Sequence, residues 1–338
     1  MTIQEIANEL NISVSTVSKA LNGASDVSAA TRQTVCAYAK KVGYKTKRSL
    51  KLKGRLGLLW AKKPEDKFSA ASQVADAFRK EAQDNMYLVF SDDLHSVDAS
   101  FDLNEYMKRQ GLDAAIFFDL NFYSPIYKKI KHTERPLVLF DNYISDNALV
   151  SGVGCDNIHA TEKAIDYLVK KGHKTIGFVG GERQSLVSAE RLAGYILGLS
   201  KNSIEYRYDI TYFGDFERQS GVDAANYFFQ NNKEITAVVC ASDNMAMGLI
   251  DQLRLLGKKI PQDVSIIGFD DLEILRYTNY NLSTIRQDFE AIGQKAFHIL
   301  DSMLNGQPAQ RAILGFKLIE RDTVIKLADQ NDPLHSPT

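Results

Sequence analysis

Apolar side chains follow two different patterns on either side of residue 55. In the first 44 residues they recur every three or four positions, as on one face of an amphipathic helix. From residue 56 onward, short continuous apolar runs alternate with longer segments of helical periodicity. The first pattern predicts a small all-helical domain, and the second predicts an α/β domain.

The N-terminal pattern predicts three short helices. Thr2 and Glu5 have the spacing of a capping box, which begins a helix over about 3–10. Ser13 can cap a second helix and Ser28 a third, which Gly43 ends. A turn of about three residues between the first two helices is typical of a helix-turn-helix, whose second helix enters the DNA major groove. The alternative is a small helical bundle without a DNA-binding role.

The rest of the chain predicts strands and helices in alternation. Apolar runs at 56–60, 87–90, 114–118 and 136–140 predict one set of strands, and runs at 175–180, 236–242 and 264–269 predict another. Around the second set, helical periodicity covers 158–171, 187–200, 218–230 and 244–256. We therefore expect two subdomains, each a doubly wound α/β layer around a parallel sheet.

Polar residues directly after these strands are candidates for ligand binding, because ligands of such sheets bind beyond the carboxyl ends of the strands. Carboxylates are good acceptors for sugar hydroxyls, and the arginine in SAERLAGY is a donor. For Asp243 and Asp271 the alternative is that each caps the helix that follows. The candidates are Asp119, Asp141, Arg191, Ser242, Asp243, Asp270 and Asp271.

Charge is divided unevenly along the chain. Residues 1–55 carry ten Lys or Arg and three Asp or Glu, whereas residues 56–338 carry 31 and 39, which makes the first part +7 and the second −8. Six of the cations lie between residues 45 and 55. A basic N-terminal segment on an acidic body is typical of a phosphate-binding domain, although a solvated basic linker would have the same charge.

Composition excludes several classes of protein. With 44% hydrophobic and 25% charged residues, the chain has the composition of a typical globular protein. It has neither a long uninterrupted apolar window nor an apolar export segment, so we expect no membrane span, no export and a cytoplasmic location. The three cysteines, Cys36, Cys155 and Cys240, are far apart and suit a reducing compartment as small core residues.

Catalytic and metal-binding motifs are also missing. The sequence contains no GxSxG and no P-loop, and no histidine pairs with a second His or Cys at metal-ligand spacing. We therefore expect no enzymatic activity, no metal and no cofactor. A glycosidase using cleft carboxylates is the enzymatic alternative, which the helical N-terminal domain makes unattractive.

The run TIQEIANELNISVSTVSKALNG, followed by VSAATRQTVCAYAKKVGY, resembles the headpiece of the lactose-repressor (LacI/GalR) family of bacterial transcription regulators. LVKKGHKTIGFVGG, SAERLAGY, SDNMAMG, VSIIGFDD and LSTIRQDFEAIGQKA match further family blocks in order and spacing. The resemblance covers nearly the whole chain. It implies an all-α helix-turn-helix headpiece and an α/β two-lobed body similar to periplasmic binding proteins.

The resemblance also implies domain limits. The DNA-binding domain is expected at 1–44, a basic hinge at 45–55 and the effector-binding domain at 56–330, with a disordered tail at 331–338. Within the effector-binding domain, the N-lobe is expected at about 56–152 and 283–312, and the C-lobe at about 153–282 and 313–330.

Base reading is assigned by the resemblance to Val14, Ser15 and Lys19, where family members vary to select operators. Positions that contact or orient the phosphate backbone are matched by Thr16, Ser18, Asn22, Ser28, Thr31 and Tyr44. For Thr31 the alternative is an ordinary residue in the first turn of a helix.

The effector pocket is likewise assigned residue by residue. Asp141, Arg191 and Asp270 match effector-binding positions, and Phe216 and Phe289 match aromatic positions that pack on the effector's ring. Two residues depart from the family: Ser242 stands where sugar-responsive members often carry Asn, and Asp119 where the lactose repressor has a neutral amide. The more acidic pocket favours a neutral, polyhydroxylated ligand over a phosphorylated one.

The implied mechanism is allosteric. A homodimer would read a near-palindromic double-stranded DNA operator, and an effector between the lobes would change the placement of the N-lobes, with the sign of the effect left open. Within the family, a regulator responsive to a purine or nucleoside, or to a carrier protein, is an alternative. Outside it, the two-lobed fold also serves sugar receptors.

The hinge departs most from the family pattern. Thr46 stands where many relatives have Pro, Ala is absent, and either Leu50 or Leu52 would be the residue that inserts into the minor groove. We expect this hinge to depend instead on phosphate contacts by Lys45, Lys47, Arg48, Lys51 and Lys53, with a solvated linker as the alternative.

Overall fold

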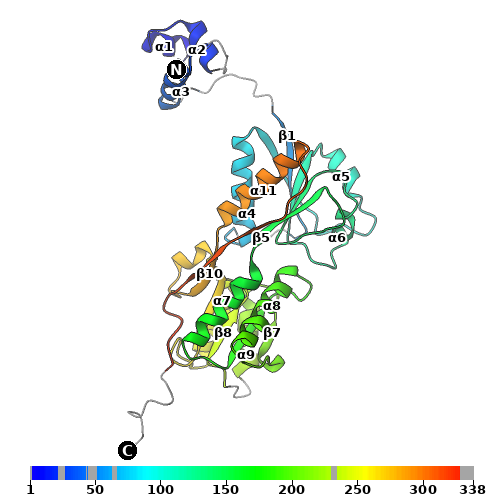
Figure 1. Cartoon of the computed structure of the whole chain (residues 1–338), viewed down its shortest axis with the longest axis vertical. Helices are drawn as coiled ribbons and strands as arrows, with labels where there is room; N and C mark the ends of the chain where they lie inside the picture. The colour runs from blue at the N-terminus through cyan, green and yellow to red at the C-terminus, as the bar shows by residue number, and fades with distance from the viewer. Residues whose placement is uncertain are drawn as a thin grey trace, which may run out of the picture. The chain divides into compact units, whose positions relative to one another are not determined.

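The computed structural model describes residues 2–21, 27–42, 44, 52–62, 67–229 and 234–327. The chain divides into two compact units, Met1–Lys53 and Gly54–Thr338. The predicted tail at 331–338 and most of the predicted hinge, including Leu50, lie outside the described residues. Figure 1 shows the elements in chain order.

The first unit is a three-helix domain, as predicted. Its helices are α1 (Ile3–Glu9), α2 (Val14–Leu21) and α3 (Ala29–Lys41). The capping box is present: the Thr2 hydroxyl accepts the N–H of Glu5, whose carboxylate accepts the N–H of Thr2. One apolar side chain from each helix, Ile6, Val17 and Val35, is completely buried in the shared core. Helical periodicity therefore placed the core correctly.

The N-lobe of the second unit is a parallel sheet covered on both faces. In β1 (Gly54–Trp60), Leu56, Leu58 and Trp60 pack in one cluster and Leu59 in another, because successive side chains point to opposite faces. Helices α4 (Ala70–Asp84) and α11 (Phe289–Leu304) cover the first face, and α5 (Leu103–Arg109) and α6 (Pro125–Ile130) the second. The strand order is β11-β5-β4-β3-β1-β2, with β2 Tyr87–Asp93, β3 Ala114–Phe118, β4 Leu137–Phe140, β5 Val150–Cys155 and β11 Ala312–Leu314.

The C-lobe repeats this arrangement with its own core. Its strand order is β12-β10-β9-β8-β6-β7, and every pairing is parallel except the one between β10 and β12. The strands are β6 Ile176–Gly180, β7 Thr211–Phe213, β8 Ala237–Cys240, β9 Ser265–Asp270, β10 Ser283–Gln287 and β12 Phe316–Ile319. The helices are α7 Asn157–Lys170, α8 Leu186–Lys201, α9 Arg218–Phe229 and α10 Asp243–Leu255, with short 3-10 turns at Tyr208–Ile210 and Glu273–Tyr277. Two doubly wound lobes were therefore predicted correctly.

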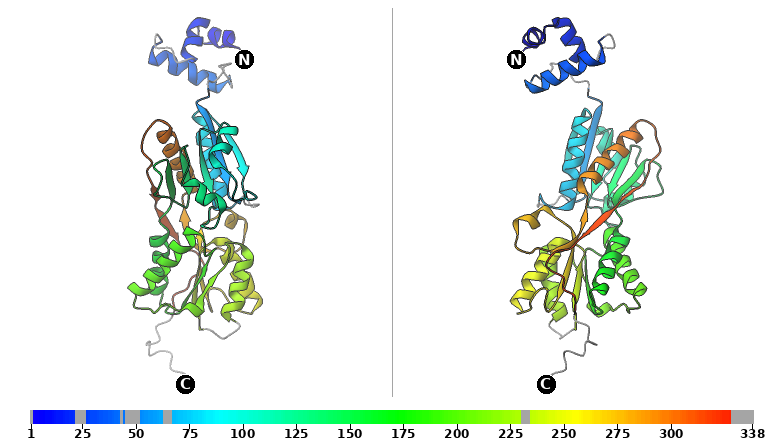
Figure 2. Two further views of the ribbon diagram at one scale, coloured as in Figure 1. Left: turned by 90° about the vertical axis from the view of Figure 1, so that its right-hand side faces the viewer. Right: turned by 60° about the vertical axis from the view of Figure 1, so that its left-hand side comes forward.

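The chain passes between the lobes three times, after β5, after β10 and between β11 and β12 (Figure 2). Residues 283–287 were expected in the N-lobe, but β10 pairs with β9 and β12 in the C-lobe sheet. Residues 153–155 and 313–314 were expected in the C-lobe, but they belong to N-lobe strands. These errors have one cause: a short strand shows which residues are apolar, not which sheet it joins.

Helices α9 and α10 pack with their backbones unusually close together. A side-chain carbon added to Gly221 would lie 2.7 Å from the Leu249 nitrogen and closer still to the carbonyl oxygen of Met245. One added to Gly248 would meet the carbonyl group of Arg218. The glycines therefore allow the two helices to touch without intervening side chains.

We predict that Gly221→Ala destabilises the protein by about 2–4 kcal/mol, although alanine normally favours a helix over glycine. The added methyl group has no space unless the two helices separate. Urea unfolding measures the effect. Gly315→Ala is the matched control because nothing lies within 4 Å of the added carbon, and equal stability of the two variants would contradict the close packing.

Candidate functional site

The outer surface of α2 carries the residues expected to read bases. Val14 is 37% exposed, and Ser15 and Lys19 are also exposed, while Val17 and Ala20 on the opposite face are buried. The amphipathic spacing of this helix therefore leaves its N-terminal polar face open to a partner. Thr16 and Ser18 lie at the edges of this face and are half-buried.

Helices α2 and α3 begin with the same arrangement of hydroxyl groups. The Ser13 oxygen accepts the N–H of Thr16 at 3.0 Å, and the Ser28 oxygen accepts the N–H of Thr31 at 3.1 Å. In each pair the two hydroxyls also bond to one another at 2.8 Å. Both helices thus present capped N-termini, where partial positive charge favours phosphate.

The remaining expected DNA contacts lie at the edge of the described structure. Tyr44 packs on the three-helix core, and its N–H donates to the carbonyl of Ala39 at 2.9 Å. Asn22, Lys45, Lys47 and Arg48 lie outside the described residues.

In the second unit, unusual backbone conformations gather beyond the strand ends. Asp119, Asp141, Phe216 and Asp270 have left-handed φ angles of 55°, 52°, 70° and 112°. Aspartate tolerates such angles better than most residues, but phenylalanine does so rarely. Strained positions of this kind are concentrated at binding and catalytic sites. All four were predicted effector-binding residues.

Arg191 is the buried centre of this region. It is 3% exposed, its Nε donates to Asn157 at 2.9 Å, and its Nη1 donates to the carbonyl of Ala241. Its Nη2 lies 3.6 Å from Asp270, and its guanidinium carbon lies 3.6 Å from the centre of the Phe269 ring. Arg191 therefore joins α8, the start of α7 and the ends of β8 and β9.

Asp141 faces Arg191 from the N-lobe. Burial raises its pKa to about 7, with further increases from Asp270 and Glu190 and decreases from Arg191 and the N–H of Cys155. Its Oδ1 is buried without a hydrogen-bond partner. An unpaired acceptor at this depth costs free energy that a bound donor would recover.

Asp119 and Asp270 extend the acidic group. Loss of hydration raises the pKa of Asp119 to about 7, helped by Asp141 and by Glu182 and Glu217 of the C-lobe. Asp119 is nevertheless an exposed residue, so it lies at the solvent-accessible end of the acidic group. Burial raises the pKa of Asp270 to about 6 against the opposing effect of Arg191.

Ser242 supports the site but has no open hydroxyl. Its oxygen caps α10 by accepting the N–H of Met245 at 3.2 Å, and its O–H donates to the carbonyl of Phe216 at 3.1 Å. The Phe216 ring in turn lies against Gly181, where any side chain would collide with it. Ser242 thus holds the strained residue Phe216 over the end of β6.

Three other sequence candidates have different surroundings. Asp243 is completely buried, and its two oxygens accept from Thr284 at 2.6 Å and the Leu272 N–H at 2.8 Å. It does not cap α10, because Ser242 does. Asp271 does not cap a helix either but pairs with Arg286 and Arg321. Phe289 is 7% exposed within the N-lobe core.

The structure adds residues that sequence reasoning missed. Asn157 bridges Arg191 to Glu190, which also accepts from Arg311 at 3.3 Å. Gln287 donates to Asp270 at 2.7 Å. Asn157 and Gln287 lie where the chain passes from one lobe to the other. The sequence could have identified them only if the positions of those passages had been predicted correctly. A cavity of about 10 Å³, the space of one water molecule, lies beside Asp141, Asn157, Glu190 and Arg311.

The described residues contain neither a candidate metal site nor a candidate membrane-spanning helix. No group of three His, Cys, Asp or Glu side chains in this part of the chain is placed to hold a metal ion. None of its helices has the length and apolar character needed to cross a membrane.

Two family models match the chain. The model for bacterial regulatory proteins of the lacI family matches residues 2–47, and that for the periplasmic binding protein-like domain matches residues 165–324. The first match covers the three helices, and the second covers most of the C-lobe together with α11. The sequence-based resemblance is confirmed.

Curated relatives match over nearly their full length. The HTH-type transcriptional regulator RegA of Clostridium saccharobutylicum is 27% identical, with 96% of this chain and 99% of RegA covered. The HTH-type transcriptional repressor PurR of Salmonella paratyphi B is 28% identical, with 96% of each chain covered.

Solved structures share the fold. A complex of the transcriptional regulator CelR with cellobiose has a TM-score of 0.74 at 24% identity, covering 96% of this chain and 99% of CelR. CcpA of Lactococcus lactis has a TM-score of 0.71 at 19% identity, covering 80% and 99%. Both relatives and both neighbours are transcription regulators. The chain therefore belongs to the lacI family of bacterial regulatory proteins, as a DNA-binding transcriptional regulator.

Proposed function

We propose that the protein represses carbohydrate-utilisation genes and that a small sugar between its lobes changes its affinity for the operator. The observation that carries the proposal is the group formed by Asp141, Asp270 and Arg191, to which both lobes contribute. Such a group binds a ligand rich in hydroxyls, which donate to the carboxylates and accept from nearby N–H groups. The CelR neighbour, a complex with cellobiose, supports a sugar ligand.

DNA recognition is the second part of the proposal. A cytoplasmic homodimer would present two copies of α2 to the half-sites of a near-palindromic operator. Val14, Ser15 and Lys19 would contact base edges, while the capped N-termini of α2 and α3 would sit against phosphates. Asn22, Lys45, Lys47 and Arg48 would add contacts that follow from the family pattern alone.

Coupling between the sugar site and the operator site would depend on the arrangement of the two lobes, which three chain passages join. The lobes already touch across the crevice, where the Phe122 N–H donates to the carbonyl of Gln184 at 3.1 Å and Asn121 approaches Glu182 at 3.4 Å. A sugar held by both lobes would favour one lobe arrangement. Linkage then requires that DNA affinity and sugar affinity change by the same factor, whichever the sign.

We predict that Lys19→Ala changes the preferred operator sequence, whereas Thr31→Ala weakens binding to all sequences alike. A base contact carries about 1–3 kcal/mol of discrimination, and a phosphate contact carries none. Selection from a random operator library, followed by measurement of Kd at fixed salt, distinguishes the two. An unchanged sequence preference for Lys19→Ala would remove that residue from base reading.

The proposed allostery predicts that one member of a sugar panel shifts operator affinity by about 5- to 150-fold without being consumed. Fluorescence anisotropy of a labelled operator, selected from the same library, measures the shift. Chromatography of the recovered sugar is the control for turnover. A sugar that binds tightly and leaves operator affinity unchanged would contradict the proposal.

Sugar binding should strengthen as pH rises through about 7. Hydroxyl donors prefer ionised carboxylates, and burial raises the pKa of Asp141 to about 7, so its carboxylate gains charge between pH 6 and pH 8. We expect affinity at pH 8 to exceed that at pH 6 by about tenfold. Calorimetric titration at the two pH values measures this. Asp141→Asn should weaken binding and reduce the pH dependence, and an unchanged pH dependence would exclude Asp141 from the contact.

A further inference from the structure

Hydrogen-bond acceptors exceed available donors in the interlobe crevice. Carboxylates reach it from both lobes: Asp141 and Glu182 raise the pKa of Asp119, and Asp270 and Glu190 raise that of Asp141. They are Asp119 and Asp141 of the N-lobe and Glu182, Glu190 and Asp270 of the C-lobe. Like charges in one group repel each other, so these carboxylates lack positive charge to balance them.

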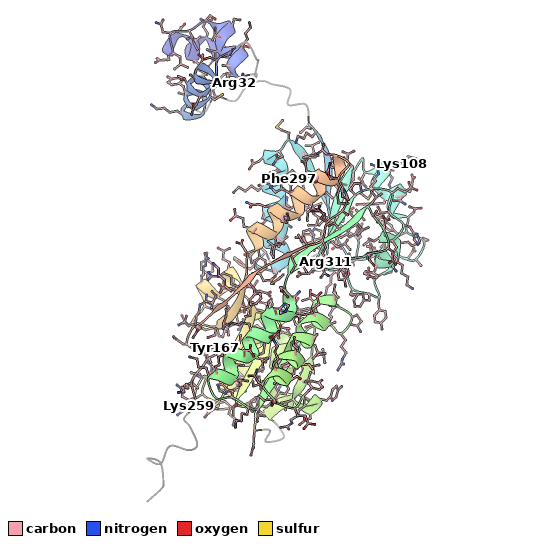
Figure 3. All side chains as sticks on the ribbon, in the orientation of Figure 1. Arg32, Lys108, Tyr167, Lys259, Phe297 and Arg311 are labelled. Carbon is pink, nitrogen blue, oxygen red and sulfur yellow. The ribbon has the colours of Figure 1, made fainter. Side chains whose placement is uncertain are left out.

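The cations beside this group are already engaged. Arg191 bonds to Asn157 and Ala241 and lies near Asp270. Arg311 pairs with Glu190 and stacks 3.8 Å above the centre of the Tyr143 ring. Arg311, which directly precedes β11, is labelled in Figure 3 on the side of the N-lobe that faces the C-lobe.

Lys62 lowers the pKa of Asp119, but its side chain is exposed. Arg183, next to Glu182, stacks on Phe213 and donates to Tyr208. Among the contacts of the described residues, neither Lys62 nor Arg183 lies within ion-pair distance of a crevice carboxylate.

Two buried oxygens in the same group have no donor. One is Oδ1 of Asp141, and the other is Oε1 of Gln287, whose side chain is 4% exposed. Gln287 uses its amide nitrogen to donate to Asp270, so the orientation of its amide is determined and its oxygen must accept. Both oxygens therefore require a donor. Asp141 of the N-lobe lies near Arg191 and Asp270, and Gln287 of the C-lobe bonds to Asp270.

We propose that the effector is an amino sugar, whose ammonium group is held by Asp141 and the Gln287–Asp270 pair. This deepens the proposed function and rests on it. An ammonium group supplies three donors, no acceptor and a positive charge, which match the excess of acceptors. Its hydrogen bonds to carboxylates are charge-assisted and about twice as strong as neutral ones.

The same features disfavour two related ligands. A phosphorylated sugar would bring negative charge toward five carboxylates. An N-acetylated amino sugar would replace two of the three donors with a carbonyl acceptor and a methyl group. A neutral hexose satisfies the orphan oxygens but leaves the charge unbalanced, so it should bind more weakly than the amine.

The experiment compares matched sugars on the full-length protein. D-glucosamine, D-galactosamine and the deacetylated disaccharide chitobiosamine are titrated by calorimetry beside their N-acetyl forms and beside D-glucose, D-galactose and cellobiose. At least one amine should bind tenfold or more tightly than its N-acetyl form and its neutral parent. Its affinity should fall with added salt, and that of the neutral sugars should not.

The variants separate local charge from general damage. Asp141→Asn should weaken binding of both kinds of sugar, and its effect on the amine should be about tenfold larger than its effect on the neutral parent sugar. Asp146→Asn is the matched control because Asp146 is an exposed N-lobe aspartate paired with Lys131, and it should leave both unchanged.

Different results would overturn the amino-sugar ligand and the proposed regulatory function. A neutral sugar that binds as tightly as its amine and shifts operator affinity would overturn the amino sugar and leave the allosteric repressor intact. If no sugar binds, both fall. Tighter binding of the amine without any effect on operator affinity would keep the ligand class and overturn the proposed regulation.

Discussion

The body of this protein depends on one buried arginine. Arg191 is almost without solvent contact, and its guanidinium group ties Asn157, the carbonyl of Ala241 and the ring of Phe269 into one assembly near Asp270. A buried cation is tolerated only where acceptors surround it. Its hydrogen bonds go to Asn157 and Ala241, Asp270 of the C-lobe lies 3.6 Å away, and its charge lowers the pKa of Asp141 of the N-lobe. The buried cation therefore lies where side chains of both lobes meet.

The surrounding backbone keeps those carboxylates where they are needed. Asp119, Asp141 and Asp270 adopt left-handed conformations as the chain leaves β3, β4 and β9. Ser242 performs the matching task for Phe216 by holding its carbonyl. Strain of this kind persists only when the neighbouring structure maintains it. Here two packed sheets with separate cores do so, which leaves the crevice between them as the part able to change.

Several residues show how far the sequence could be interpreted. The strands ending at Asp119, Asp141 and Asp270 were identified because continuous apolar runs are typical of strands buried on both faces. Arg191 was recognised as a donor, but not as a buried residue with its donors occupied. Asp243 follows a strand like the others, yet its oxygens are taken by Thr284 and Leu272 inside the C-lobe. Asn157, Glu190, Gln287 and Arg311 gave no periodic signal at all.

The sequence by itself determined the three-helix headpiece, the two sets of strands and the basic-to-acidic division of charge. These follow from local periodicity, capping residues and composition, all of which act over a few residues. Only the tertiary structure decided which sheet β5, β10 and β11 join and which polar side chains share the crevice. Pairing between strands far apart in sequence depends on packing of the whole lobe. The balance of donors and acceptors depends on that pairing, because it decides which buried oxygens keep a partner.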